Sequence, residues 1–118
     1  MPCKIKNNLG TINIESEVVA RIAGMCAMEC YGVVGMAAKS AKDGITHLLK
    51  IENLTRGIRI IANDDFVNID LHIIAEYGTN IAAISESLMS SVKYNVQEMT
   101  GLNVGRVSVY VDGLRVNG

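Results

Sequence analysis

The sequence is poor in aromatic residues: among its 118 residues it has no tryptophan and only one phenylalanine, Phe66. Aromatic side chains make up 4% of the chain, whereas hydrophobic residues of all kinds reach 49%. Disordered chains contain too little apolar surface to form a core, so this proportion excludes that class. The core must therefore be aliphatic, built mainly from isoleucine, valine, leucine and methionine.

Long apolar runs and an excess of charge are also missing. No segment approaches the roughly 20 apolar residues of a membrane-spanning helix, and the N-terminal MPCKIKNNLG lacks the apolar run of a signal peptide. We therefore expect a cytoplasmic protein without direct membrane insertion. Its three cysteines are an odd number in a reducing compartment, which argues against a disulfide framework. The net charge of -1, without a basic stripe, argues against a nucleic-acid partner.

The N-terminal half predicts a strand followed by an amphipathic helix. Ile12 and Ile14 alternate with polar residues, and Ser16 is a suitable N-cap for a helix. Apolar residues then recur at helical spacing, at Val18, Val19, Ile22, Ala23, Cys26, Ala27 and Cys30. The helix should end at Gly32, because glycine adopts positive φ there without a steric cost. Residues 39–44 look like a loop, and residues 45–54 suggest a short helix.

The C-terminal half predicts two strands, a long helix and a last strand. Residues 58–62 and 67–76 alternate apolar and polar side chains around the turn residues 63–65, which is typical of a hairpin with one buried face. An apolar helical stripe follows, formed by Ile81, Ile84, Leu88, Val92, Val96 and Met99. Alternating valines then predict a strand over 106–111, which a turn at Asp112-Gly113 should end.

This order, β-α-(short α)-β-β-α-β, predicts an α+β two-layer sandwich. We expect a four-stranded mixed or antiparallel sheet with both helices on one face, and a ferredoxin-like arrangement is compatible with it. The predicted boundaries are an N-terminal tail at 1–9, a single domain at 10–114 and a C-terminal tail at 115–118.

The segment after the first helix is apolar where turns are usually polar. It consists of Gly32, Val33, Val34, Gly35 and Met36. A turn facing water gains nothing from such side chains, so the segment either folds back into the core or contacts a partner. We take it as the predicted protein-binding interface. Two apolar residues expected on the outer face of the sheet, Ile74 and Tyr110, are added to this interface.

Reactive groups do not converge anywhere in the sequence. Cys26 and Cys30 are four residues apart on one helix face, but a structural zinc site needs about four ligands, and only Cys3, His47 and His72 remain to complete one. Both cysteines also fall in the apolar stripe, where cysteine behaves as a small hydrophobe. The aspartates near residue 64 are explained as turn residues. We therefore expect no enzymatic activity, metal or cofactor.

One nucleic-acid motif remains as an alternative. Gly32-Val33-Val34-Gly35 matches the GXXG loop with which KH domains clamp a nucleic-acid backbone between two helices. Only two positions of this pattern are fixed, and valine donates nothing to a phosphate. The alternative function is therefore a KH-like RNA-binding module that uses this loop.

Three segments in order, GTINIESEVVARIAG, ECYGVVGMA and IIAEYGTNIAAISESLMSSVKYNVQEMTGLNVGRVSVYVDGLRV, resemble the alkaline shock protein family. Its members are envelope stress response proteins of Gram-positive bacteria. The likeness covers nearly the whole chain, and the compact length is similar to that of the short housekeeping members.

The resemblance implies a non-enzymatic binding or scaffold protein that is linked to the cell-envelope stress response or homeostasis. It also implies a cytoplasmic protein acting through protein–protein contacts. The partner is a membrane-anchored protein, which would hold the chain peripherally at the membrane, a second copy of the chain, or both. The family has no established catalytic residues to carry over.

Overall fold

The structure is a computed structural model that describes residues 2–37 and 55–116. The loop expected at 39–44 and the short helix expected up to residue 54 lie outside these ranges. The described elements are, in order, β1 (Cys3–Asn7), β2 (Gly10–Ile14), α1 (Ser16–Glu29), β3 (Val33–Met36), β4 (Ile58–Ala62), β5 (Val67–Glu76), α3 (Ile81–Thr100) and β6 (Val104–Arg115). The predicted α+β class is confirmed, and the structure adds strands β1 and β3.

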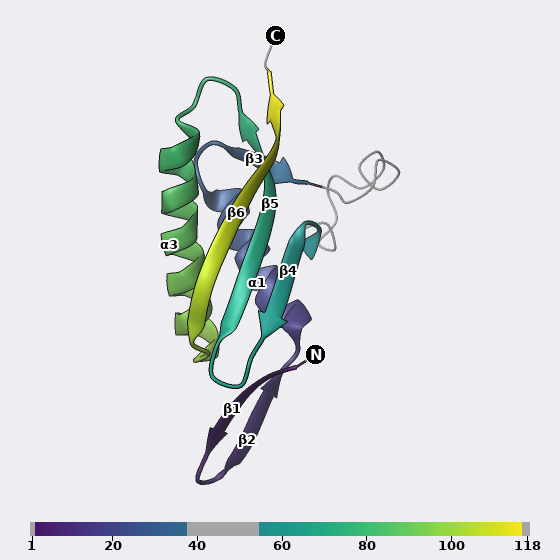
Figure 1. The fold of residues 1–118 in the computed structure, drawn as a ribbon, viewed down its shortest axis with the longest axis vertical. Coiled ribbons are helices and arrows are strands. Elements are labelled where there is room, and N and C mark those ends of the chain that lie inside the picture. Colours follow the sequence, from purple (N-terminus) through teal and green to yellow (C-terminus); the bar gives the residue numbers. More distant parts are fainter. Residues whose placement is uncertain (1, 38–54, 117–118) are drawn as a thin grey trace.

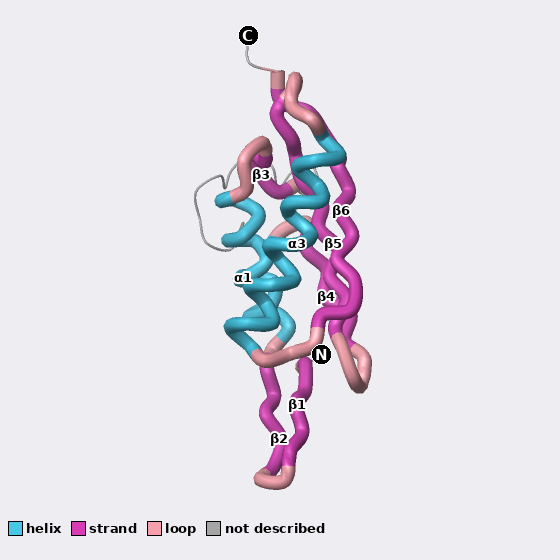
Figure 2. Tube along the Cα trace, turned by 90° about the vertical axis from the view of Figure 1, so that its left-hand side faces the viewer, coloured by secondary structure: helices cyan, strands magenta, loops and turns pink. Residues whose placement is uncertain are grey.

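The main body has two layers. Helices α1 and α3 pack side by side against one face of a sheet formed by β3, β4, β5 and β6, as predicted, and the described elements leave the other face uncovered (Figure 1, Figure 2). Strands β1 and β2 form a separate antiparallel hairpin that projects from one end of this body (Figure 1). A ferredoxin-like arrangement would place β2 in the main sheet, but here it pairs only with β1 among the described strands.

Strand β5 is the centre of the main sheet. On one edge it pairs in parallel with β6 along its whole length, from Val67 to Glu76. The other edge pairs antiparallel with β4 up to Leu71 and with β3 from Ile73 onwards. Strands β3 and β4 therefore lie end to end along the same edge of β5, and the sheet is mixed.

His72 marks the junction between β3 and β4. Its carbonyl accepts a hydrogen bond from the N–H of Ala37 at 2.9 Å, and its N–H donates to the carbonyl of Gly57 at 2.8 Å. Gly57 has φ +75°, and a Cβ atom there would lie 2.5 Å from the carbonyl oxygen of Ala37. The close approach of the two strands therefore requires glycine at this position.

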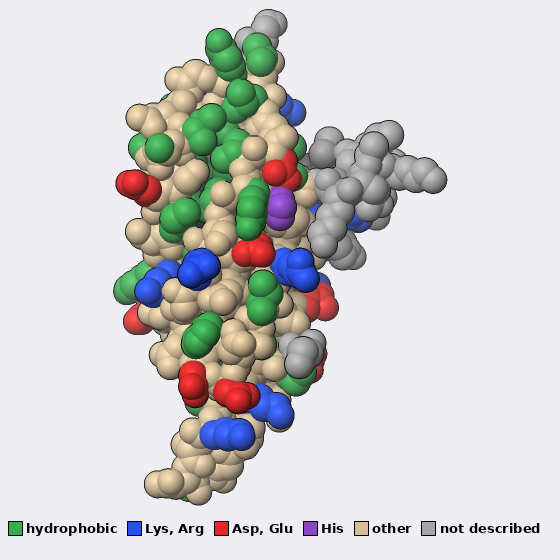
Figure 3. Space-filling model, viewed as in Figure 1, with side chains coloured by type: hydrophobic (Ala, Val, Ile, Leu, Met, Phe, Trp, Pro, Cys, Tyr) green, Lys and Arg blue, Asp and Glu red, His purple; other side chains and the backbone are tan. Residues whose placement is uncertain are grey.

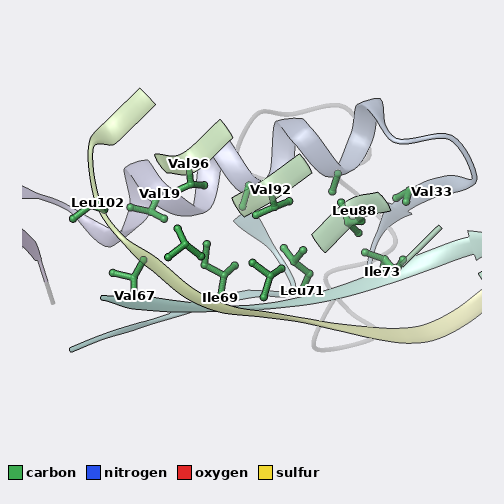
Figure 4. Close-up of a cluster of buried hydrophobic side chains, with 14 of the residues drawn as sticks. Val19, Val33, Val67, Ile69, Leu71, Ile73, Leu88, Val92, Val96 and Leu102 are labelled. Atoms are coloured by element: carbon green, nitrogen blue, oxygen red, sulfur yellow. The ribbon is translucent and has the colours of Figure 1, made fainter. Parts of the chain in front are cut away.

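The core lies between β5 and the two helices (Figure 4). The alternation predicted for β5 is confirmed, because Val67, Ile69, Leu71 and Ile73 are at most 1% exposed and the intervening residues are half-buried. They meet the helical stripes, whose fully buried members are Val19, Ala23 and Ala27 of α1 and Leu88, Val92 and Val96 of α3. Burying one such aliphatic side chain contributes about 2 kcal/mol, so this layer supplies most of the stability.

The helix ends follow their local chemistry. The side chain of Asn80 accepts a hydrogen bond from the N–H of Ala83 at 3.0 Å and caps α3. The predicted cap at Ser16 is wrong by one residue: Glu15 occupies the N-cap position of α1, without a side-chain cap bond. The acidic side chains of Glu15 and Glu17 still place negative charge near the positive end of the helix.

The predicted N-terminal tail and the predicted turn at Asp112-Gly113 require correction. The segment expected as an N-terminal tail contains β1, and Cys3 in it is 1% exposed and belongs to the core. At the other end, β6 continues to Arg115, so Asp112-Gly113 is not a turn. The residue register shifts there from Ile73–Val111 to Ile74–Gly113, which leaves Asp112 as an extra residue in a β-bulge.

Replacing Gly57 with alanine is expected to lower the free energy of unfolding by about 2 kcal/mol or more, because alanine is strained at this φ and would overlap the Ala37 carbonyl. Gly35 is a matched control, since an added Cβ there meets nothing within 4 Å. Gly35→Ala should change stability by less than about 0.5 kcal/mol. Urea unfolding followed by circular dichroism measures both variants, and equal midpoints would contradict the junction described above.

Candidate functional site

The predicted interface at Gly32–Met36 is mostly a strand and not a turn. Of this segment, Gly32 alone belongs to the turn after α1, with φ +89°, and Val33–Met36 form β3. Val33 is 7% exposed and lies in the core, and Met36 packs against the core. A register shift between Val33 and Gly35 puts the side chains of Val33 and Met36 on the core side, with Val34 in the irregular position. The sequence left two possibilities for this segment, folding back into the core or contacting a partner. The side chains of Val33 and Met36 follow the first.

The outer face of the main sheet carries the other predicted residues. Tyr110 is 46% exposed and Ile61 is 39% exposed, while Ile74 is half-buried. Figure 3 shows that hydrophobic side chains gather over the upper half of this face, over the C-terminal ends of β5 and β6, whereas most charged side chains lie below them. The structure therefore brings Ile74 and Tyr110 onto one surface, at the level where β3 pairs with β5.

At the centre of this face, three side chains form a contact between β5 and β6. The rings of His72 and Tyr110 are stacked, with centroids 4.6 Å apart and planes inclined by 13°. Nδ1 of His72 lies 2.8 Å from Oδ2 of Asp112. Asp112 is the extra residue of the β-bulge in β6. The contact fixes the Tyr110 ring flat against its neighbour, so an aromatic face is held in a defined place on the surface.

Both register partners of Ile74 are glycines, Gly35 on β3 and Gly113 on β6. A Cβ added at Gly113 would lie 3.8 Å from Cγ1 of Ile74, and one added at Gly35 would meet nothing within 4 Å. The residues directly opposite the isoleucine therefore contribute no side chain next to it. The sequence contained both glycines, but their position beside Ile74 depends on two register shifts that no local pattern reveals.

The candidate reactive residues do not meet. Cys26 and Cys30 are partly buried against the core, and burial raises the pKa of the Cys26 thiol, with a further rise from Glu29 and an opposing effect of a hydrogen bond with Asn95. Asp64 and neighbouring Asp65 are exposed in the β4–β5 turn. Within residues 2–37 and 55–116, no group of three or more His, Cys, Asp or Glu side chains is placed to hold a metal ion.

A groove of about 570 Å³ lies between the projecting hairpin and the main body. Lys4 and Lys6 line it on the β1 side, and Asp64, Asp65 and Phe66 line it on the side of the β4–β5 turn. Because its two walls carry opposite charges, the groove has no electrostatic preference for an anionic or a cationic ligand.

In the described part of the chain, no helix is both long and apolar enough to cross a bilayer.

Comparison with known proteins identifies the family. The model of the alkaline shock protein 23 family, which is described as having a cell envelope-related function, matches residues 4–116. The Bacillus subtilis protein YloU is 41% identical over 117 residues, which cover 98% of both chains. The Streptococcus pyogenes protein Spy1614 is 36% identical over 119 residues, covering 100% of this chain and 98% of its own length.

More distant relatives are larger. Streptococcus pyogenes proteins named stress response regulator gls24 homologues are 28% identical over 102 residues, covering 86% of this chain but 57% of theirs. The family match spans nearly all of β1 and all of β6. The resemblance seen in the sequence is thus confirmed, and the chain belongs to the alkaline shock protein family, whose function is related to the cell envelope.

Proposed function

We propose that the protein is a non-enzymatic binding or scaffold protein of the cell-envelope stress response, which acts through protein–protein contacts. The observation that carries this proposal is the outer face of the main sheet, which no described helix covers and whose upper half is apolar. The family assignment supports the link to the envelope. The partner is a protein that is anchored in the membrane and holds this chain at the inner surface of the envelope.

The chemistry of the face suits a protein partner. Tyrosine is enriched at the centres of protein interfaces because its ring supplies a large apolar area with little conformational freedom to lose. Tyr110 is already held flat by His72, so binding would cost little further side-chain entropy. Ile74, whose register partners are two glycines, offers an apolar side chain that would insert into a complementary pocket of the partner. Single exposed hydrophobic residues are common on proteins, but here they share one half of one face.

The face is also poorly suited to the competing classes. A sheet that reads RNA usually offers two or three aromatic side chains for base stacking. Among the described residues at the centre of this outer face, Tyr110 is the one tyrosine, phenylalanine or tryptophan. Asp70 and Asp112 on the same face would repel phosphate groups. For catalysis, ionisable side chains would have to converge in a pocket, whereas His72 and Asp112 meet on an open surface at 35% and 46% side-chain exposure.

Replacing Ile74 or Tyr110 with aspartate should abolish capture of the partner, because a charge on this surface must be desolvated on binding. Co-purification from native cells, followed by mass spectrometry, should show at least a tenfold loss of the partner, or about 1.4 kcal/mol. Tyr94→Asp is the matched control, since Tyr94 is 63% exposed on α3, in the opposite layer. Val33 is unsuitable for this test, because aspartate there would enter the core.

The proposal fails if the Ile74 and Tyr110 variants, shown to be folded by circular dichroism, capture the same proteins as the wild type. It also fails if the Tyr94 variant alone loses them, because the partner would then bind the helical layer.

RNA binding through Gly32–Gly35 is the alternative function, and the described geometry supports it less. KH domains clamp the backbone with a loop between two helices, but here Val33 and its neighbours pair with β5. We expect no binding when fluorescent random-sequence RNA is titrated at low salt, where electrostatic affinity is greatest. Saturable, salt-sensitive binding that Gly35→Asp removes would favour the RNA-binding function instead.

A further inference from the structure

The hairpin formed by β1 and β2 projects from the main body (Figure 1, Figure 2). An isolated two-stranded hairpin is at best marginally stable in water. This one has an apolar face, formed by Cys3 and Ile5 opposite Ile14 and Ile12. Cys3 and its neighbours at the base are covered by the body, but Ile12 is 49% exposed, and Leu9 at the tip is 98% exposed. The far half of the hairpin thus exposes apolar side chains that its own body does not cover.

The two edges of the hairpin differ in charge. Strand β1 carries Lys4 and Lys6, and lysines on an edge strand are a common protection against pairing with another chain. Its edge also faces the groove next to the β4–β5 turn. Strand β2, with the sequence GTINI, carries no charge, and among the described residues only β1 pairs with it. The edge of β2 is therefore open and unprotected.

We propose that two copies of the chain associate through this edge, with β2 of one copy pairing antiparallel with β2 of the other around a two-fold axis beside Ile12. In this register, Ile12 lies opposite its symmetry mate and Thr11 lies opposite Asn13. Gly10 lies opposite Ile14, so all five residues of β2 take part. Apolar residues then face apolar residues, and polar residues face polar residues. The result is one four-stranded sheet made of two hairpins.

Other pairings are less favourable. Shifting the two β2 strands by one residue places Ile12 opposite Asn13 and moves the apolar side chains to opposite faces. A shift by two residues keeps the faces matched but shortens the overlap. Pairing through β1 around Ile5 would set Lys4 of each copy opposite Lys6 of the other, and like charges directly opposite each other are destabilising. The β2 pairing alone uses the full strand without a conflict.

The same register gives the exposed tip a place to pack. Continuing it by one residue puts Leu9 of one copy opposite Glu15 of the other, where α1 begins. Val18 in the first turn of that helix is 46% exposed. The pairing thus brings Leu9, the most exposed leucine among the described residues, close to an uncovered valine of the other copy. Because the contact is confined to one short hairpin from each copy, its area is at the low end for protein interfaces, and dimerisation should depend on concentration.

This inference is independent of the proposed function, because the hairpin and the apolar half of the outer face lie at opposite ends of the molecule (Figure 1, Figure 3). Sedimentation velocity over a hundredfold range of concentration should show the wild-type chain passing from monomer to dimer. Ile12→Lys places two ammonium groups together at the axis and should raise the dissociation constant at least tenfold. Tyr94→Lys, which adds the same charge on exposed α3, should leave it unchanged.

Cysteine cross-linking tests the register itself. In an antiparallel pair, directly opposite Cα atoms are about 4.5–5.5 Å apart, within the range of a disulfide. Ile12→Cys should therefore form a covalent dimer on mild oxidation. Thr11→Cys and Asn13→Cys should each form no covalent dimer when oxidised alone, although they still associate, but should cross-link when mixed. The wild-type chain is the control, because Cys3 is buried, and Cys26 and Cys30 partly so, away from the β2 edge.

The proposal is overturned if the wild type stays monomeric throughout, or if Ile12→Lys and Tyr94→Lys dimerise equally well. A dimer in which Thr11→Cys cross-links alone, but not when mixed with Asn13→Cys, would show a different pairing and overturn this one. The Ile74 and Tyr110 variants separate the two proposals, because they should lose the partner and keep the dimer.

Discussion

Strand β5 is hydrogen-bonded along both edges but buried on only one face, and the remaining structure depends on this constraint. Its inner side chains, from Val67 to Ala75, form the base of the core on which both helices pack. Its outer side chains are then necessarily displayed on the uncovered face, where no described helix shields them. The proposed binding function rests on this surface, and the composition of the surface decides what it can bind.

The main elements were predictable because the apolar residues in each of them recur at the regular spacing of a strand or a helix. The alternation of β5 and the stripe from Ile84 to Val96 specify which face is buried without reference to any other part of the chain. The outward position of Ile74 and Tyr110 followed from the same alternation. These predictions need only local geometry, since side chains two residues apart in a strand, or three to four apart in a helix, share a face.

The elements that could not be predicted depend on strand register and on contacts between distant segments. Strand β1 has the alternating pattern of Lys4, Ile5 and Lys6, but five residues without a predicted partner look the same as a tail. Val33 enters the core because a register shift in β3 aligns it with Ala75, and only the completed sheet decides such a shift.

The bulges also explain why the candidate surface lies where it does. A β-bulge bends its strand and increases the local twist of the sheet. Both neighbours of β5 have an irregularity at the level of Ile74, one in β3 and one in β6. The extra residue in β6 also lets Asp112 reach His72. The sheet is therefore most distorted where its outer face is most apolar. The register partners Gly35 and Gly113 contribute no side chain opposite Ile74, which remains half-buried on this face.

The separation of the two surfaces has a physical consequence for a scaffold protein. A dimer joined through the β2 hairpins leaves both outer faces uncovered, because each face lies at the end of its copy farthest from the joint (Figure 1). Each dimer would then offer two equivalent binding faces to partners held in one membrane. Once one face is bound, the second binds from a high effective concentration, and the combined affinity can exceed that of a single face by a factor of about 100 or more. Weak self-association and moderate partner binding are thus enough for stable attachment, without a large interface at either end.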